Sequence, residues 1–112
     1  MACLYRAEYG QAHEDKNFKC TRDQEIVTVE GLAQGEKFHS VQEAFVKYGG
    51  VQCGFCTPGL IMSAVDRLRD NTQLTEEDVR FAIGGNLCRC TGYTKVVQTI
   101  LQAAEVMRAA AP

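Results

Sequence analysis

Residues 51–59 read VQCGFCTPG, and residues 85–93 read GNLCRCTGY. Each stretch places two cysteines at short spacing among glycines, as CxxC in the first motif and as CxC in the second. Four thiols in two such motifs are compatible with a disulfide framework, a zinc site or a site for an iron-sulfur cluster. The remainder of the chain has to discriminate among these three kinds of site.

Composition makes disulfides the least favoured of the three. The 112-residue chain has 12 basic and 14 acidic side chains and a formal net charge of −2, with 46% hydrophobic residues. This is typical of one globular domain; it does not indicate nucleic-acid binding, and no apolar run is long enough for a membrane span. The N-terminus lacks the pattern of a secretory signal, so we expect a cytoplasmic location. In that reducing compartment, closely spaced cysteines are more often metal ligands or catalytic thiols.

Apolar residues at helical spacing predict two helices around the first motif. Ser40 with Glu43 is a capping box for the first helix, and Gly49-Gly50 ends it. Thr57 as the cap and Pro58 as the first helical residue open the second helix, which ends before Asn71. The predicted buried faces are Val41, Ala44, Phe45 and Tyr48 in the first helix, and Leu60, Ile61, Ala64, Val65 and Leu68 in the second.

Two further helices flank the second motif. Thr75 with Asp78 opens a short third helix that ends at Gly84-Gly85, and a fourth helix runs from about Thr94 into the C-terminal alanines. The predicted buried faces are Val79, Ala82 and Ile83 in the third helix, and Val96, Val97, Ile100, Leu101, Ala104 and Met107 in the fourth.

These elements predict a mainly α fold, a small four-helix bundle. Residues 1–36 form an irregular N-terminal segment with one short β-strand at EIVTVEG (25–31), and residues 37–112 form the helical domain. Both cysteine motifs fall in connections between helices. If the bundle brings the two connections to the same end, the four thiols converge there.

Ligand chemistry alone leaves zinc and iron open. Four cysteine thiolates satisfy either a tetrahedral zinc ion or a [2Fe-2S] cluster. The glycines beside the cysteines, Gly54, Gly59, Gly85 and Gly92, have no side chain to keep backbone N–H groups away from the sulfurs. Hydrogen bonds from such N–H groups to the sulfurs tune the reduction potential of a cluster.

The pair of motifs QCGFCTPG and GNLCRCTGY, preceded by IVTVEGLA and VQEAF, closely resembles the helical [2Fe-2S] domain of the molybdenum hydroxylases, which form the xanthine oxidase family. The likeness is greatest to bacterial members with a separate small subunit, such as carbon monoxide dehydrogenase and aldehyde or isoquinoline oxidoreductases. It runs from about Glu25 to Lys95. The two motifs together make the resemblance highly specific.

The resemblance implies a role for each motif residue. Cys53, Cys56, Cys88 and Cys90 would bind one [2Fe-2S] cluster per chain. Gln52 would contact the pterin of the molybdenum cofactor on a large partner subunit, and Cys90 would lie close to that pterin. The cluster would take electrons from molybdenum and pass them onward, towards FAD on a flavin subunit.

The chain departs from the family pattern near its N-terminus. Small subunits of this family begin with a plant-type ferredoxin domain whose CxxxxCxxC run is absent here, and only Cys3 and Cys20 lie outside the two motifs. Two thiols cannot hold a second [2Fe-2S] cluster within one chain. We therefore expect residues 1–36 to be a remnant or leader in which Cys3 and Cys20 are free thiols.

The sequence thus favours an electron-transfer subunit, or a fragment of one, that performs no bond chemistry itself. The alternatives are a structural four-cysteine zinc module for protein interaction and a truncated remnant that holds no cluster. His13 and His39 have no partner at metal or catalytic spacing, so we expect surface or capping roles for them.

Overall fold

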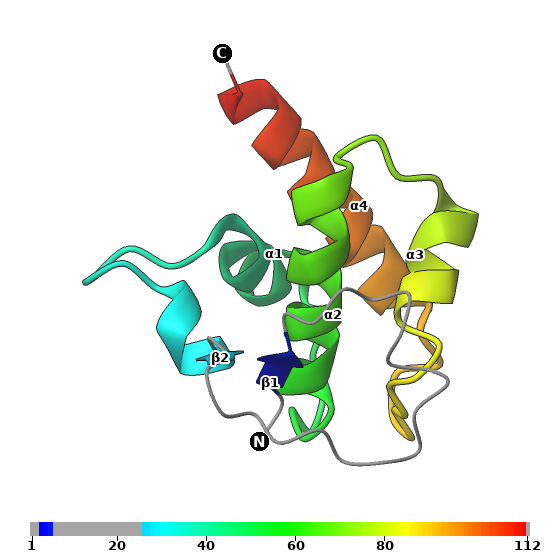
Figure 1. Cartoon of the computed structure of the whole chain (residues 1–112). Helices are drawn as coiled ribbons and strands as arrows, with labels where there is room; N and C mark the ends of the chain where they lie inside the picture. Colours follow the sequence, from blue (N-terminus) through cyan, green and yellow to red (C-terminus); the bar gives the residue numbers. More distant parts are fainter. Residues whose placement is uncertain (1–2, 6–25, 112) are drawn as a thin grey trace.

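The structure, a computed structural model, describes residues 3–5 and 26–111. The strands β1 (Cys3–Tyr5) and β2 (Ile26–Thr28) pair antiparallel, and a 3-10 helix, η1 (Val29–Leu32), follows β2. Four α-helices come next in the described part, as Figure 1 shows: α1 (Ser40–Tyr48), α2 (Thr57–Asp70), α3 (Glu76–Ala82) and α4 (Thr94–Ala110). The four helices and the strand at β2 confirm the predicted mainly α fold, and β1 is an unpredicted partner strand.

The four helices share one apolar core. Both α2 and α4 pack against α1 and against α3. The predicted faces form most of this core, and Leu60, Val65, Leu68, Val96 and Ile100 are almost completely buried. Each such side chain contributes roughly 1.5–3 kcal/mol through its removal from water. Other predicted positions lie at the core edge and are only partly buried: Tyr48, Ala82, Leu101 and Met107.

The capping box of α1 lies one residue earlier than the sequence predicts. His39 is the N-cap: its Nδ1 accepts a hydrogen bond from the Val41 N–H at 3.2 Å, and its own N–H donates to Gln42 Oε1 at 2.9 Å. Gln42 Nε2 also donates to the Val29 carbonyl at 3.1 Å, which ties η1 to α1. The predicted box of Ser40 and Glu43 is therefore wrong because Gln42, held from both sides, fixes the helix start at Ser40.

The start of α2 also differs from the prediction. Cys56 is the N-cap residue and Thr57 is the first helical residue, and no side chain caps this helix. The predicted end at Asn71 is confirmed. At α3 the predicted box is confirmed, since the Thr75 N–H donates to Asp78 Oδ2 at 2.9 Å and the Asp78 N–H donates to Thr75 Oγ1 at 3.2 Å.

The N-terminal segment is described only in part. Leu32 of η1 is buried in the helical core. His13, Cys20 and most of the predicted leader lie outside the described residues, and the domain boundary after residue 36 stays a prediction. Within the described ranges, no helix is long and apolar enough to cross a membrane.

Two glycines turn the chain from α1 into the first cysteine motif. Gly49 ends α1 in the left-handed conformation, with φ of 69°. Gly50 is buried, and a Cβ atom at this position would lie 2.8 Å from Thr99 Oγ1 and 3.2 Å from Thr99 Cβ in α4. Thr99 is itself buried and β-branched, so it has little freedom to move away.

We therefore expect Gly50→Ala to lower the free energy of unfolding by about 1–3 kcal/mol, as overpacked cores do. Urea unfolding followed by circular dichroism measures the change. The matched control is Gly85→Ala, because a Cβ atom there meets nothing within 4 Å. Equal stability of the two variants would contradict the close contact between Gly50 and α4.

Candidate metal centre

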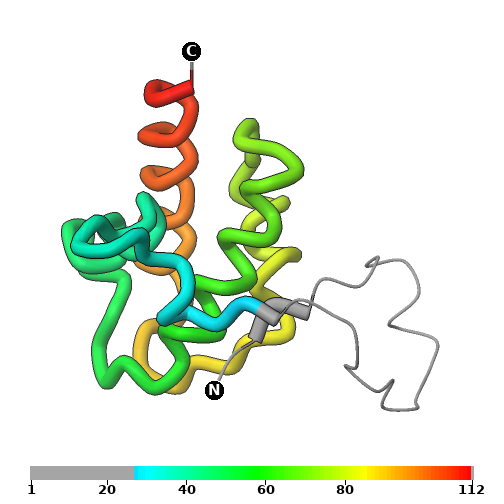
Figure 2. Tube along the Cα trace, turned by 60° about the vertical axis from the view of Figure 1, so that its left-hand side comes forward, coloured from blue at the N-terminus to red at the C-terminus, as the bar shows by residue number. Residues whose placement is uncertain are grey.

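The two cysteine-bearing loops lie at the same end of the helices. In both Figure 1 and Figure 2, α2 and α4 begin at this end, and the loops before them lie side by side there. Cys56 directly precedes α2 and Tyr93 directly precedes α4. The start of each long helix therefore determines where one cysteine motif ends.

The four sequence-predicted cysteines come together as two pairs. The Cys56 and Cys88 thiols are close enough for each to shift the pKa of the other, and the Cys53 thiol is close enough to Cys90 to raise the pKa of Cys90. Each pair takes one cysteine from each loop. Cys56 and Cys88 are half-buried, whereas Cys53 and Cys90 are exposed. The site therefore has an inner and an outer pair of sulfurs.

Cys88 has a lowered pKa. Thr91 provides two contacts to its sulfur: Thr91 Oγ1 lies 3.0 Å from Cys88 Sγ, and the Thr91 N–H donates to Sγ at 3.4 Å. These hydrogen bonds from Thr91, with a further one from the Cys56 thiol, lower the pKa of Cys88 to about 7. A thiolate is the form that binds metal, so Cys88 is prepared as a ligand near neutral pH.

The partner thiols are held in the neutral form. Burial, followed by the hydrogen bond and charge of Cys88, raises the pKa of Cys56 to about 11. The hydrogen bond with the Cys53 thiol is the main cause that raises the pKa of Cys90. Neighbouring thiolates repel one another, and a cation that binds these thiols displaces their protons.

Tyr93 connects the second loop to itself. Its hydroxyl accepts a hydrogen bond from the Cys88 N–H at 2.8 Å and donates one to the Asn86 carbonyl at 3.0 Å. Tyr93 also has φ of 69°, a left-handed conformation that costs a non-glycine residue roughly 1–2 kcal/mol. Gly92 before it has φ of 63°. The two bonds of the hydroxyl explain why a tyrosine is retained where the backbone favours glycine.

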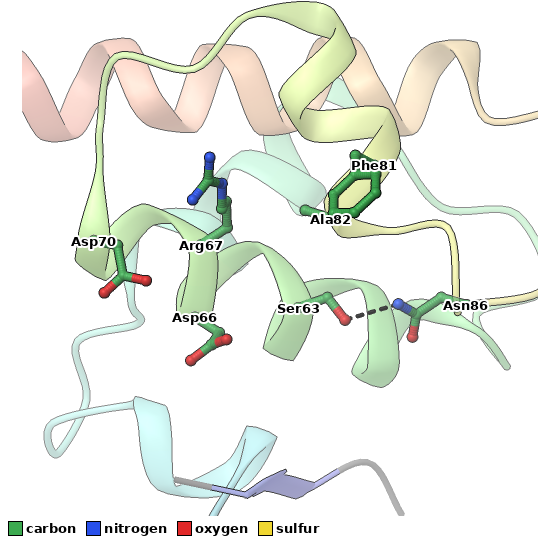
Figure 3. A pocket seen from close by; sticks show the side chains of 8 residues that line it. Ser63, Asp66, Arg67, Asp70, Phe81, Ala82 and Asn86 are labelled. Carbon is green, nitrogen blue, oxygen red and sulfur yellow. Dashed lines mark hydrogen bonds between the residues drawn. The ribbon is translucent and has the colours of Figure 1, made fainter. Parts of the chain in front are cut away.

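The second loop is also attached to α2. Asn86 Nδ2 donates to Ser63 Oγ at 2.7 Å, as Figure 3 shows. This bond borders a cavity of about 650 Å³ between α2 and α3, whose lining includes the charged residues Asp66, Arg67 and Asp70. Burial, with repulsion from Asp70, raises the pKa of Asp66. None of the four cysteines lines this cavity, so it is separate from the thiol site.

The donor set fits an iron-sulfur cluster. A [2Fe-2S] cluster takes four cysteine thiolates, two on each iron, and the thiols here form two pairs. In the described part of the chain, no group of three or more His, Cys, Asp or Glu side chains forms a metal site. The Thr91 N–H, directly before Gly92, donates to the Cys88 sulfur, and Gly59 lies within α2.

Sequence reasoning missed Thr91 and Tyr93 as parts of this site. A signal for Thr91 was present, because a threonine follows the last cysteine of both motifs. Tyr93 gave none, since its role depends on where the ring points. His39 is confirmed as a capping residue. Gln52 is exposed beside Cys53, and its contact with the pterin stays a prediction.

Comparison with known proteins also indicates a [2Fe-2S] site. The family model described as "[2Fe-2S] binding domain" matches residues 28–101. The xanthine dehydrogenase iron-sulfur-binding subunit of Escherichia coli O157:H7 is 44% identical over 102 residues, which cover 89% of this chain and 57% of that protein. The nicotinate dehydrogenase small FeS subunit of Eubacterium barkeri is 45% identical over 80 residues, covering 71% of this chain and 51% of the relative.

Solved structures have the same fold. Quinoline 2-oxidoreductase from Pseudomonas putida 86 aligns with a TM-score of 0.69 and 43% identity, over 75% of this chain and 53% of that one. Aldehyde oxidoreductase from Desulfovibrio gigas aligns with a TM-score of 0.71 and 45% identity, over 78% of this chain and 10% of that one. The chain thus spans about half the length of the small subunits that it matches. The family model matches more than half of this chain, and the chain therefore belongs to the [2Fe-2S] binding domain family.

Proposed function

We propose that this chain is the electron-transfer component of a molybdenum-containing hydroxylase or dehydrogenase, and that Cys53, Cys56, Cys88 and Cys90 hold its [2Fe-2S] cluster. The observation that carries the proposal is the arrangement of the four thiols as two pairs, each with one cysteine from each loop. When bound, such a cluster accepts and releases electrons without bond chemistry by the protein.

The chain's own residues keep the ligands in place. In this proposal the inner pair, Cys56 and Cys88, is shielded by the helix ends, and Thr91 stabilises the charge on the Cys88 sulfur. The outer pair, Cys53 and Cys90, is exposed, so in this proposal it is the pair that an electron donor approaches. The inner ligands would then stabilise the cluster, and the outer ligands would let an electron donor approach it.

The partner in this proposal is a large subunit that carries the molybdenum cofactor, with Gln52 and Cys90 nearest its pterin. Both residues are exposed at the thiol end of the molecule. Large apolar side chains flank them there: Phe55 is 96% exposed and Leu87 is 87% exposed. Apolar side chains around a functional group are typical of a contact surface for another protein. The names of the relatives as iron-sulfur subunits support a multi-subunit assembly, and a flavin subunit is the proposed next carrier.

The first test is the metal content of the whole chain. After anaerobic treatment with iron and sulfide, we expect visible charge-transfer absorption with about two irons and two sulfides per chain. Cys88→Ser should abolish or rearrange the cluster, because a hard oxygen ligand suits iron less well in this setting. The matched controls are Cys3→Ser and Cys20→Ser, which alter thiols outside both motifs and should leave the absorption unchanged.

Two results would contradict the proposal. A colourless chain with one zinc ion would indicate a structural zinc module, and a chain that takes up no metal would indicate a cluster-free remnant.

Gln52→Ala examines the contact to the partner separately. This variant should keep its cluster and, in the assembled complex, slow the electron transfer from molybdenum. Loss of the cluster in Gln52→Ala would assign that residue a structural role.

A second prediction concerns the scaffold of the second loop. Tyr93→Phe leaves the half-buried Cys88 N–H without its acceptor, so we expect a loss of about 1–3 kcal/mol in unfolding free energy and faster iron release. Release of iron to a chelator, followed at the visible bands, measures the effect. Tyr48→Phe is the control, since Tyr48 packs at the core edge on α1. An unchanged release rate in Tyr93→Phe would mean that this hydroxyl does not secure the ligand loop.

A further inference from the structure

Two hydroxyl groups in the described part of the chain are buried without a hydrogen-bond partner, those of Thr57 and Thr99. Thr57 directly follows Cys56 and is the first residue of α2. Its backbone N–H donates to the Gly54 carbonyl at 3.3 Å, but its side chain caps nothing. A buried hydroxyl that finds no acceptor costs about 1–3 kcal/mol, so its presence beside a cysteine motif calls for an explanation.

The second motif contains the counterpart of this residue. Thr91 directly follows Cys90, just as Thr57 directly follows Cys56, so that each motif ends in Cys-Thr. The Thr91 hydroxyl has a sulfur partner within the chain, since its Oγ1 lies 3.0 Å from Cys88 Sγ and either atom can be the donor. Sulfur is therefore the partner that a threonine in this position already uses at the same site.

We propose that the Thr57 hydroxyl donates a hydrogen bond to a sulfur of the bound [2Fe-2S] cluster and thereby raises the reduction potential of the cluster. This inference rests on the proposed function. Reduction adds negative charge to the sulfurs, and a donor held against them stabilises the reduced form more than the oxidised form. Thr57 is in this view a residue that positions and tunes the cluster, and it takes no part in bond chemistry.

The burial of the hydroxyl strengthens the effect. In a site from which water is excluded, a hydrogen bond interacts more strongly with a nearby charge than it does in solvent. The Thr57 Oγ1 is fully buried, so water does not compete for its proton. The side chain also begins a helix of 14 residues, and its backbone is therefore held firmly. The acceptor in this proposal is an inorganic sulfide of the cluster, because the Thr57 hydroxyl has no cysteine sulfur as a hydrogen-bond partner in the structure.

The test uses the full chain loaded with cluster and compares variants that differ at one hydroxyl. Thr57→Val keeps the shape of the side chain and removes the donor. We expect a lower reduction potential in this variant by spectroelectrochemistry. We also expect a smaller shift of the Fe–S stretching bands in resonance Raman spectra when D₂O replaces H₂O. Thr57→Ser keeps the donor and should behave like the wild type in both measurements.

Thr99→Val is the matched control, because it removes the other buried hydroxyl, which lies against Gly50 in α4. It should leave the potential and the deuterium shift unchanged. If Thr57→Val does not load with cluster, the pair Thr57→Ala and Thr57→Ser decides, since both lack the methyl group and they differ in the hydroxyl. Equal potentials and equal deuterium shifts within the decisive pair would overturn the inference.

The two proposals fail in different ways. A wild-type chain that takes up no iron overturns the proposed function, and the inference about Thr57 falls with it. A wild-type chain that loads with about two irons and two sulfides, next to a Thr57→Val variant with the same potential and the same deuterium shift, overturns the inference alone.

Discussion

The parallel start of α2 and α4 at one end of the bundle is the constraint on which the thiol site depends. Figure 2 shows both helices running away from the end that carries the cysteine loops. Their shared packing against α1 and α3 fixes where each helix begins, and hence where Cys56 and Tyr93 lie. Two helix N-termini also direct partial positive charge towards the sulfurs, which favours thiolates and a negatively charged cluster. The orientation of α2 and α4 thus determines both the packing of the core and the electrostatics of the thiol site.

The apolar core alone does not hold the thiols, because Cys56 is the only one of the four motif cysteines that packs against it. The second loop is fixed by polar contacts: the Tyr93 hydroxyl links Cys88 to Asn86, and Asn86 in turn bonds to Ser63 on α2. The strained backbone of Tyr93 shows that these contacts outweigh a local cost of roughly 1–2 kcal/mol. The first loop is fixed by close packing, since Gly50 lies against Thr99. The two loops are therefore held in place by different means.

The sequence predicted the helices and their buried faces because those depend on local patterns. The Thr75–Asp78 box and the stop at Gly49 follow from residues a few positions apart, and they were predicted correctly. The box of α1 was misplaced because Gln42 is held from outside its helix by Val29. β1 was missed because three residues carry no alternation pattern, and it exists through its pairing with β2. The pairing of the thiols depends on tertiary packing, and spacing alone could not predict it.

An exposed apolar side chain does not by itself indicate a contact surface in this molecule. Its position relative to the cysteine motifs has to be considered as well. Val46 on α1 is 82% exposed, although it lies outside both motifs. Phe55 and Leu87, by contrast, come from different loops and are each adjacent to a cysteine in sequence. A side chain exposed to this extent adds almost nothing to the stability of the isolated chain. If the outer thiols bind a cluster, a partner that covers Phe55 and Leu87 would exclude water from the cluster. Hydrogen bonds to the cluster are stronger where water is excluded, and these bonds tune its reduction potential. The same residues would then serve both the docking of a partner and the potential of the cluster.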